Sequence, residues 1–451
     1  FNYSRCTFNY FSKALGKKLK HMKKNILKKL FLAALGFLAA GMAVGTVQAG
    51  RLLGEFRPEF HGEIEVETQF NHVYSVDNRQ PGRRTNVFSE CDDCIFRLGL
   101  FPEIGIVLNI GAGPEHEELD KENVLYKNME MFAEEFFIHY ASSNLVRSDF
   151  IDEIGFFGGK FNPVFGLVNG GLRSEFEFPG IFSEEFPEQY ELKEMVGGGA
   201  EITFHSHHWG EHTLRASTFY RDNSFLQASF PAYRARNTLS KGGALAIGGG
   251  PANTGTPQSW SVNLSGEDLP IGGLKYELGF RYLHSATQFA EGRNDIAKHD
   301  DVGVSAGLIY NKAFFLPRPA FRYPLDMKAM FEYAHFNNFN GIANANRSDR
   351  DYYTASLQGK YGPWLLAFIY SRQDIHVPWD KDQLEAFEDD FDDEAEVNKS
   401  VGDDLYEVNL GYRFNPNWLL QGSWALTEEY EDEKAKEQGV FAVELDYQLV
   451  F

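Results

Sequence analysis

The chain has 451 residues, with 43 lysines and arginines against 64 aspartates and glutamates, and a formal net charge of −21 at pH 7. This acid excess argues against a nucleic-acid partner, because phosphate groups are bound mainly by lysine and arginine. Aromatic residues, which are enriched in β-strands, make up 15% of the chain.

The amino-terminal region has the order of features found in a secretory signal peptide, which we assign to residues 22–49. A basic stretch opens at Met22, an apolar stretch follows from Leu30, and small residues precede a cleavage site after Ala49. A membrane anchor is the alternative, but the apolar stretch is shorter than the roughly 20 residues that a spanning helix needs. Residues 1–21 are interpreted as upstream sequence translated in error or as an artefact.

Residues 50–451 contain many segments in which apolar and polar residues alternate. In one of the clearest, Tyr276, Leu278 and Phe280 alternate with polar or small residues. Period-two alternation places the two sets on opposite faces of a strand, as expected for a barrel wall between lipid and water. The same test predicts sixteen strands, near 59–72, 86–99, 103–114, 128–142, 152–162, 196–206, 213–222, 258–266, 273–285, 301–311, 325–335, 351–360, 363–373, 403–414, 417–428 and 439–451.

The connections between these strands alternate between long and short. With both ends of the barrel in the periplasm, the odd-numbered connections are extracellular and should be long, and the even-numbered ones should be short turns. The long set includes 163–195 and 429–438, and the short set includes 361–362 and 415–416, although 312–324 is long for a turn. The sequence therefore predicts an all-β, transmembrane antiparallel barrel of sixteen strands over 50–451.

Two segments resemble known outer-membrane proteins. The run Gly-Gly-Lys-Phe-Asn-Pro-Val-Phe-Gly at 158–166 is similar to a segment of the porin superfamily that includes phosphate-selective porins, with Val164 in place of a proline. The alternating end of the chain resembles the assembly signal of bacterial outer-membrane barrels, carried here by Tyr447, Leu449 and Phe451. These resemblances imply a sixteen-stranded porin fold, a possible homotrimer, and partners that include the barrel assembly machinery. They do not imply phosphate selectivity, because no ladder of basic residues is found.

The third connection, 163–195, is the candidate constriction loop. It is rich in glutamates, with Arg173 and Lys193 as the only opposing charges, and its aromatic residues could pin it to the inner wall. A solvated surface loop is the alternative. The charged residues of this connection and those that alternation places on the inner face of the strands form the candidate pore-lining set. This set is Glu63, Glu65, Glu67, Lys160, Arg173, Glu175, Glu177, Glu184, Glu185, Arg215, Glu277, Arg281, Glu332, Glu407 and Arg413.

A wide barrel with an acid-rich lumen predicts a passive channel for small hydrophilic solutes or ions, with a weak cation preference. Its expected surroundings are the lipid and lipopolysaccharide of the bacterial outer membrane. If many of the charges pair, little selectivity would remain. The alternative function is a substrate-specific uptake channel or receptor for a siderophore, phosphate or another small ligand. A barrel enzyme would need a grouping of the Ser/His/Asp type, no nucleophile motif is evident, and neither enzymatic activity nor a cofactor is expected.

Two further groups of residues bear on chemistry. Cys91 and Cys94 flank two aspartates, and in an oxidising cell envelope this pair predicts a disulfide. The alternatives are a redox motif, which would need a thioredoxin-like context, and a zinc site, which would need two more ligands. Free thiols are the remaining alternative. Four histidines cluster around the third short turn, with Glu211 among them: His205, His207, His208 and His212. They form either a metal site or a polar interfacial turn, and no metal ligand is assigned.

Overall fold

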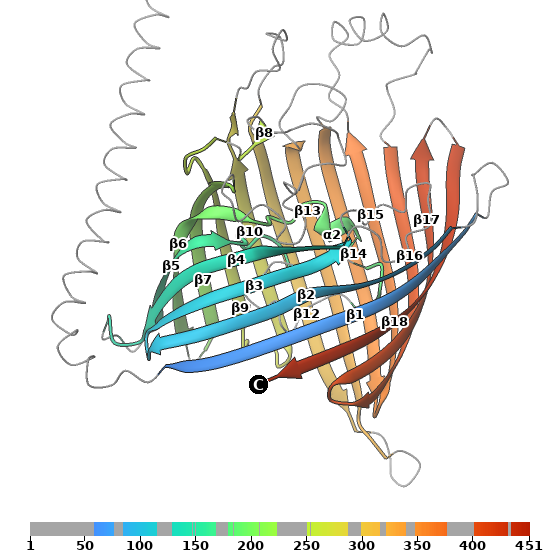
Figure 1. The fold of residues 1–451 in the computed structure, drawn as a ribbon, viewed down its shortest axis with the longest axis horizontal. Helices are drawn as coiled ribbons and strands as arrows, with labels where there is room; N and C mark the ends of the chain where they lie inside the picture. Colours follow the sequence, from blue (N-terminus) through green and yellow to red (C-terminus); the bar gives the residue numbers. More distant parts are fainter. Residues whose placement is uncertain are drawn as a thin grey trace, which may run out of the picture. The chain divides into compact units, whose positions relative to one another are not determined.

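The protein is a closed antiparallel β-barrel, shown in Figure 1. The computed structural model describes residues 58–75, 84–114, 129–146, 148, 150–167, 179–183, 185–206, 208–222, 250–252, 254–286, 299–315, 322–339, 348–376, 401–431 and 434–451. The expected signal peptide lies outside these residues and stays a prediction. No helix among the described residues is long and apolar enough to cross a membrane.

Sixteen strands form the ring, as the sequence predicted. They are β1 (Glu59–Ser75), β2 (Arg84–Phe101), β3 (Ile104–Pro114), β4 (Met129–Ser142), β5 (Ile151–Phe161), β6 (Met195–Ser206), β7 (Gly210–Arg221), β9 (Ser259–Glu267), β10 (Leu274–Leu283), β12 (Asp301–Phe314), β13 (Leu325–Phe339), β14 (Ser348–Tyr361), β15 (Trp364–His376), β16 (Val401–Asn415), β17 (Trp418–Glu431) and β18 (Lys434–Val450). Two short strands, β8 (Gly250–Pro251) and β11 (Ser285–Ala286), form a separate pair, and α2 spans Glu185–Glu188.

The ring closes where β1 pairs with β18. The ladder runs from Glu63, opposite Val450, to Ser75, opposite Gln438. It continues past β18, because the Gly62 N–H donates to the Phe451 carbonyl at 2.8 Å and the Phe451 N–H donates back to Gly62 at 2.9 Å. Every strand of the ring therefore has two hydrogen-bonded neighbours, which leaves no open sheet edge.

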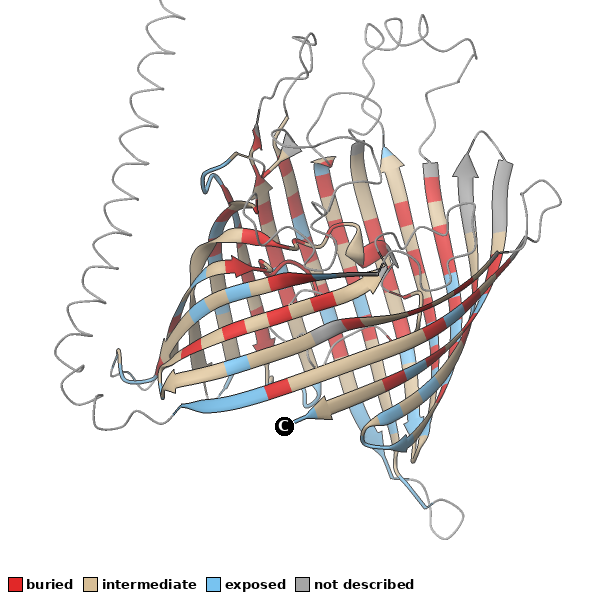
Figure 2. Ribbon diagram, in the orientation of Figure 1, coloured by how far each residue is buried: buried red, intermediate tan, exposed pale blue. Residues whose placement is uncertain are grey.

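The two faces of the wall follow the alternation in the sequence. Outward side chains are apolar and solvent-exposed on strand after strand, for example Leu278, Phe331 and Leu410, which are 48%, 44% and 53% exposed. Inward positions on the same strands are often buried, and Figure 2 shows buried residues alternating with exposed ones along individual strands. An outward apolar band on a closed barrel is the surface that a lipid bilayer would cover.

The connections sort into two ends of the barrel, which we call the short-turn end and the long-connection end. Turns at 102–103, 362–363 and 416–417 lie at the short-turn end, where β1 also begins. One prediction was wrong: residues 429–438 are not a long loop, because β17 and β18 remain paired up to Glu431 opposite Lys434. The sequence of this hairpin is rich in charged residues and does not alternate between apolar and polar positions, so alternation did not predict strands there.

Candidate functional site

Between β5 and β6 the structure describes residues 162–167, 179–183 and 185–194. These residues lie inside the barrel, and we call them the inward segment. The helical turn α2 contacts β14 and β15 (Figure 1). The backbone of the inward segment also reaches Glu332 on β13 and Glu407 on β16. The inward segment therefore lies against the inner wall far from the strands that it connects.

Buried charges hold the base of the inward segment. The Lys160 ammonium, at the end of β5, lies 2.9 Å from a carboxylate oxygen of Glu194 and 3.1 Å from one of Asp222. All three side chains are at least nine-tenths buried. A lysine shared by two carboxylates in a buried site compensates part of the desolvation cost of each charge. This cluster ties the start of β6 and the end of β7 to β5.

Asn162 completes the base. Its backbone N–H donates to Glu135 at 2.9 Å and its side-chain amide donates to Glu134 at 3.0 Å, both on β4. Its side-chain oxygen accepts the Glu194 N–H at 2.8 Å. Asn162 therefore connects β4 with Glu194, the last residue of the inward segment.

On the opposite wall, Glu332 receives the backbone of the inward segment. Its carboxylate, on β13, accepts the Leu167 N–H at 3.0 Å. The preceding residue, Gly166, has φ of +81°, and a Cβ atom there would lie 2.3 Å from a Glu332 oxygen. Glycine is required at this point both for the backbone conformation and for the close approach of the carboxylate.

Glu407 repeats this arrangement further round the ring. Its carboxylate, on β16, accepts the Ile181 N–H at 2.8 Å and the Phe182 N–H at 3.2 Å, and the Ser423 hydroxyl also donates to it. The preceding Gly180 has φ of +141°, and its Cβ would lie 2.7 Å from the carboxylate oxygens. Two glutamates thus each bind a backbone N–H that directly follows a glycine of positive φ.

Arg281, on β10, joins the wall to the aromatic residues of the inward segment. Its guanidinium donates to the Tyr190 carbonyl at 2.5 Å and lies 3.0 Å from the Asp301 carboxylate. It also stacks over the Phe336 ring, with 4.2 Å to the centroid, a cation–π contact in a buried site. Burial and the neighbouring Glu332 carboxylate raise the pKa of the Tyr190 hydroxyl well above its usual value, so this hydroxyl stays protonated.

Small residues on β10 and β12 make room for the segment. A Cβ at Gly307 would lie 2.4 Å from the Leu167 side chain, and one at Gly279 would lie 3.2 Å from the Phe165 ring. Phe165 is 1% exposed and packs on Phe336 with ring centroids 5.7 Å apart. The apolar part of the inward segment is therefore packed as tightly as a protein core.

The other candidate pore-lining residues are distributed along the wall. Glu277 accepts a hydrogen bond from the Asn263 amide at 2.7 Å, and two nitrogens of the Arg215 guanidinium donate to one carboxylate oxygen of Glu201. Near the short-turn end, Glu63 lies 3.7 Å from Arg97, and Arg413 donates to a turn carbonyl. Glu65 and Glu67 lie on β1, where Glu67 groups with Glu444 and Asp446 of β18. Four other candidates lie outside the described residues, namely Arg173, Glu175, Glu177 and Glu184, and the side chain of Glu185 is not described.

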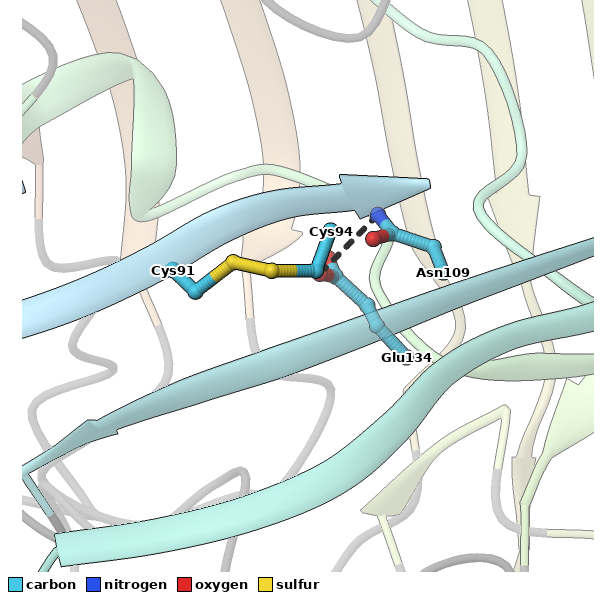
Figure 3. Close-up of a disulfide and its surroundings, with 4 residues drawn as sticks. All are labelled: Cys91, Cys94, Asn109 and Glu134. Atoms are coloured by element: carbon cyan, nitrogen blue, oxygen red, sulfur yellow. Dashed lines mark hydrogen bonds between the residues drawn. A yellow bond between two sulfur atoms is a disulfide. The ribbon is translucent and has the colours of Figure 1, made fainter. Parts of the chain in front are cut away.

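The predicted cysteine pair and assembly signal also have defined places. Cys91 and Cys94 are joined by a disulfide within β2, at an irregularity in the pairing with β3 (Figure 3). Nearby, the Asn109 amide donates to Glu134 at 3.5 Å.

The residues of the predicted assembly signal lie along β18 and at its end. Tyr447 packs on Trp418 with ring centroids 4.6 Å apart, and Phe451 lies 6.0 Å from the ring of Phe60 across the closing ladder. Leu449 is opposite Ile64 in that ladder.

Several residues of the site were not among the sequence candidates. The partners Asp222 and Asp301 each follow or begin a strand, and Gly166 and Gly180 lie among many other glycines. The porin-like run at 158–166 was the one signal near them, because it contains both Lys160 and Gly166. Sequence spacing could not indicate which strand the segment would reach.

Comparison with solved structures finds several matches over most of the chain. OprB of Pseudomonas putida is 10% identical with a TM-score of 0.52, over 89% of this chain and 96% of that one. OmpF of Salmonella typhi, solved with daunomycin, is 10% identical with a TM-score of 0.45, over 88% and 98%. OccK9 of Pseudomonas aeruginosa is 10% identical with a TM-score of 0.43, over 87% and 99%. No protein-family model and no curated protein matches the chain.

The similarity to OprB concerns the fold. The closed ring confirms the prediction of a sixteen-stranded antiparallel barrel, and OprB has a similar fold. The narrower resemblance to phosphate-selective porins, carried by residues 158–166, stays a prediction.

Proposed function

We propose that this porin-like barrel lies in the bacterial outer membrane and acts as a passive channel for small hydrophilic solutes or ions, with a weak cation preference. The closed ring, its outward apolar band and the fold shared with OprB support the location and the channel role. The inward segment would narrow the lumen, and its position would set the size of solute that passes. Assembly into a homotrimer stays part of the proposal.

The cation preference rests on the different partners of acidic and basic groups at the described inner wall. Lys160, Arg215 and Arg281 each contact carboxylates. By contrast, the hydrogen bonds to Glu277, Glu332 and Glu407 come from neutral amide, backbone or hydroxyl donors. The basic charge is therefore compensated locally, whereas these acids have no cationic partner among those contacts. These three carboxylates are only 1–2% exposed, so in this proposal they act on a passing cation through the electric field of the wall and not by direct contact.

The test is electrical. The refolded barrel is inserted in a planar bilayer, and single-channel conductance and the reversal potential are measured across a KCl gradient. Discrete steps with a cation-favouring reversal potential are expected. Strong anion selectivity would refute the preference, and a folded barrel that produces no steps would refute the open channel.

A substrate-specific channel is the second candidate, because the inward segment packs so closely against the wall. Phe165 and Tyr190 are 1% and 2% exposed, which is more burial than a loosely held loop would show. Such a channel predicts that its ligand blocks ion current in a saturable way. A current that stays proportional to solute concentration would favour the general channel.

A further inference from the structure

Three potential metal ligands meet at the short-turn end of the lumen, away from the inward segment. They are Asp152 on β5, His205 on β6 and Glu211 on β7, and their ligand atoms all lie within 4.8 Å of one another. We propose that these residues bind one divalent transition-metal ion, for which Zn²⁺ is the best chemical match. The site does not depend on the proposed channel function.

The strand register brings His205 and Glu211 together. They are direct cross-strand partners in the β6–β7 hairpin, whose turn follows immediately. Both lie an even number of residues from the inward pair Glu201 and Arg215, so period-two alternation places them on the inner face. Directly opposed residues on one face have Cβ atoms about 4.5–5.5 Å apart, which is close enough to share an ion.

The third ligand is supplied by a break in the next ladder. The pairing of β5 with β6 is irregular between Ile151 and Glu153, so Asp152 is the extra residue at that point. The His205 N–H still donates to the Phe150 carbonyl at 3.0 Å, which holds the two strands in register beyond the irregularity. A bulge of this kind redirects a side chain, and here the Asp152 carboxylate meets His205 and Glu211.

The chemistry of the three groups suits zinc. Imidazole nitrogens and carboxylate oxygens both bind zinc, and a site with three protein ligands leaves the fourth position open to water. Imidazole favours zinc, copper and nickel over magnesium and calcium. Zinc lies about 2.0–2.2 Å from such ligands, so two ligand atoms of one ion are at most about 4.4 Å apart. Small side-chain rotations would therefore close the site.

The local charge also favours a cation. Asp152 and Glu211 are close carboxylates, and Glu267 and Asp268 lie near Glu211 as well. Lys275 lies 2.9 Å from Glu267 and offsets part of that charge. Close carboxylates repel one another when ionised, and a bound divalent ion would relieve this repulsion more completely than the single imidazole can.

The other described histidines of the cluster have different environments. His212 faces outward, where it stacks on Phe204 with ring centroids 5.2 Å apart and bonds the Tyr276 hydroxyl at 2.8 Å. His208 is exposed in the turn. His207 lies outside the described residues. The structure therefore separates one candidate ligand, His205, from two histidines that serve as neighbours for comparison.

The experiment titrates Zn²⁺ into the full chain refolded in detergent and follows the heat of binding. One zinc ion per barrel is expected, and an excess of Mg²⁺ should not displace it. His205→Ala and Glu211→Gln should each weaken binding by about tenfold or more, since even supporting residues of metal sites have effects of about 10–100-fold. His208→Ala, a change in the adjacent turn, should leave the affinity unchanged.

Two outcomes would overturn the proposal. One is a folded native barrel that binds no zinc stoichiometrically, which would mean that His205 only bridges two carboxylates. The other is equal zinc affinity in His205→Ala and His208→Ala, which would place the ion elsewhere. If His205→Ala does not fold, Asp152→Asn replaces it, because Asp152 is exposed at the irregularity; unchanged zinc binding in that variant would equally refute the site.

Discussion

Two of the regions where the inward segment is attached to the barrel, its base and the far wall, hold it in different ways. At its base, Lys160 lies between Glu194 and Asp222 in a buried ionic cluster. On the opposite wall, Glu332 and Glu407 accept backbone N–H groups, and neither contact uses a basic side chain. The base depends on the mutual compensation of charges, whereas the far wall depends on glycine and on the shape of the backbone.

The difference follows from the distance along the chain. The residues of the base lie at the ends of β5, β6 and β7, which are neighbours in the ring. The far contacts join residues 165 and 226 positions apart. A backbone N–H has a fixed direction once φ and ψ are set, so a carboxylate that receives it fixes the position of the segment without long, flexible side chains.

Removing the lysine of the base should have the largest effect. Lys160→Met leaves the buried Glu194 and Asp222 carboxylates without their shared ammonium group, and breaking a buried ion pair costs about 3–5 kcal/mol. Chemical denaturation of the refolded barrel measures this loss in the free energy of unfolding. Adding Asp222→Asn should recover part of it, because one of the two buried charges is then removed.

A loss of less than about 0.5 kcal/mol in Lys160→Met, the range usual for surface changes, would show that the base is not held by charge. The contrast between the two attachment regions would then disappear.

Adding a methyl group at the far wall should have the next largest effect. Gly166→Ala forces a residue with Cβ into φ of +81° and places that atom 2.3 Å from Glu332. Strained backbone conformations cost about 1–3 kcal/mol, and we expect the segment to leave the wall at this point. Single-channel recording should show a larger or noisier conductance together with the loss of stability.

Gly422→Ala is the matched control for this change, since a Cβ there would have its nearest neighbour at 3.8 Å and the residue needs no positive φ. Equal behaviour of the two variants would mean that Gly166 is not required for the contact with Glu332.

Neutralising the wall glutamates should have the smallest effect on stability and the clearest effect on selectivity. Glu332→Gln and Glu407→Gln keep a side-chain oxygen for the backbone donors, so we expect losses of about 1 kcal/mol, the difference between charged and neutral hydrogen bonds. Each should reduce the cation preference in the reversal potential. Glu59→Gln, an exposed change at the start of β1, serves as the control and should change neither quantity.

The strands of the ring could be predicted because the alternation of apolar and polar residues is a local pattern in the sequence. Alternation alone assigns residues such as Tyr276, Leu278 and Phe280 to one face of a strand, and glycine and proline mark the tight turns. Alternation failed to predict the strand extensions of the hairpin from β17 to β18, because apolar and polar residues do not alternate in that part of the sequence. It also missed the two-residue strands β8 and β11, which are too short for any periodicity.

The site could be predicted only by face and not by partner. Alternation assigned Glu277, Glu332 and Arg281 to the inner wall, and the structure places them there. The contacts of Glu332 and Arg281 with the inward segment join distant parts of the chain, and no local pattern encodes such a pairing. The charge-rich stretch that includes Glu175 and Glu177 was chosen by composition, and it lies outside the described residues.

The ladder between β1 and β18 has a consequence for how the protein forms. Gln448 on β18 bonds Glu63 on β1 across 385 positions of sequence, so the ring cannot close until the intervening strands are in place. Contacts of such high sequence separation form slowly. Until closure, the first and last strands expose unpaired backbone groups that invite pairing with other chains. The seam is therefore the point at which the growing sheet is most exposed to aggregation, and its closure ends that exposure.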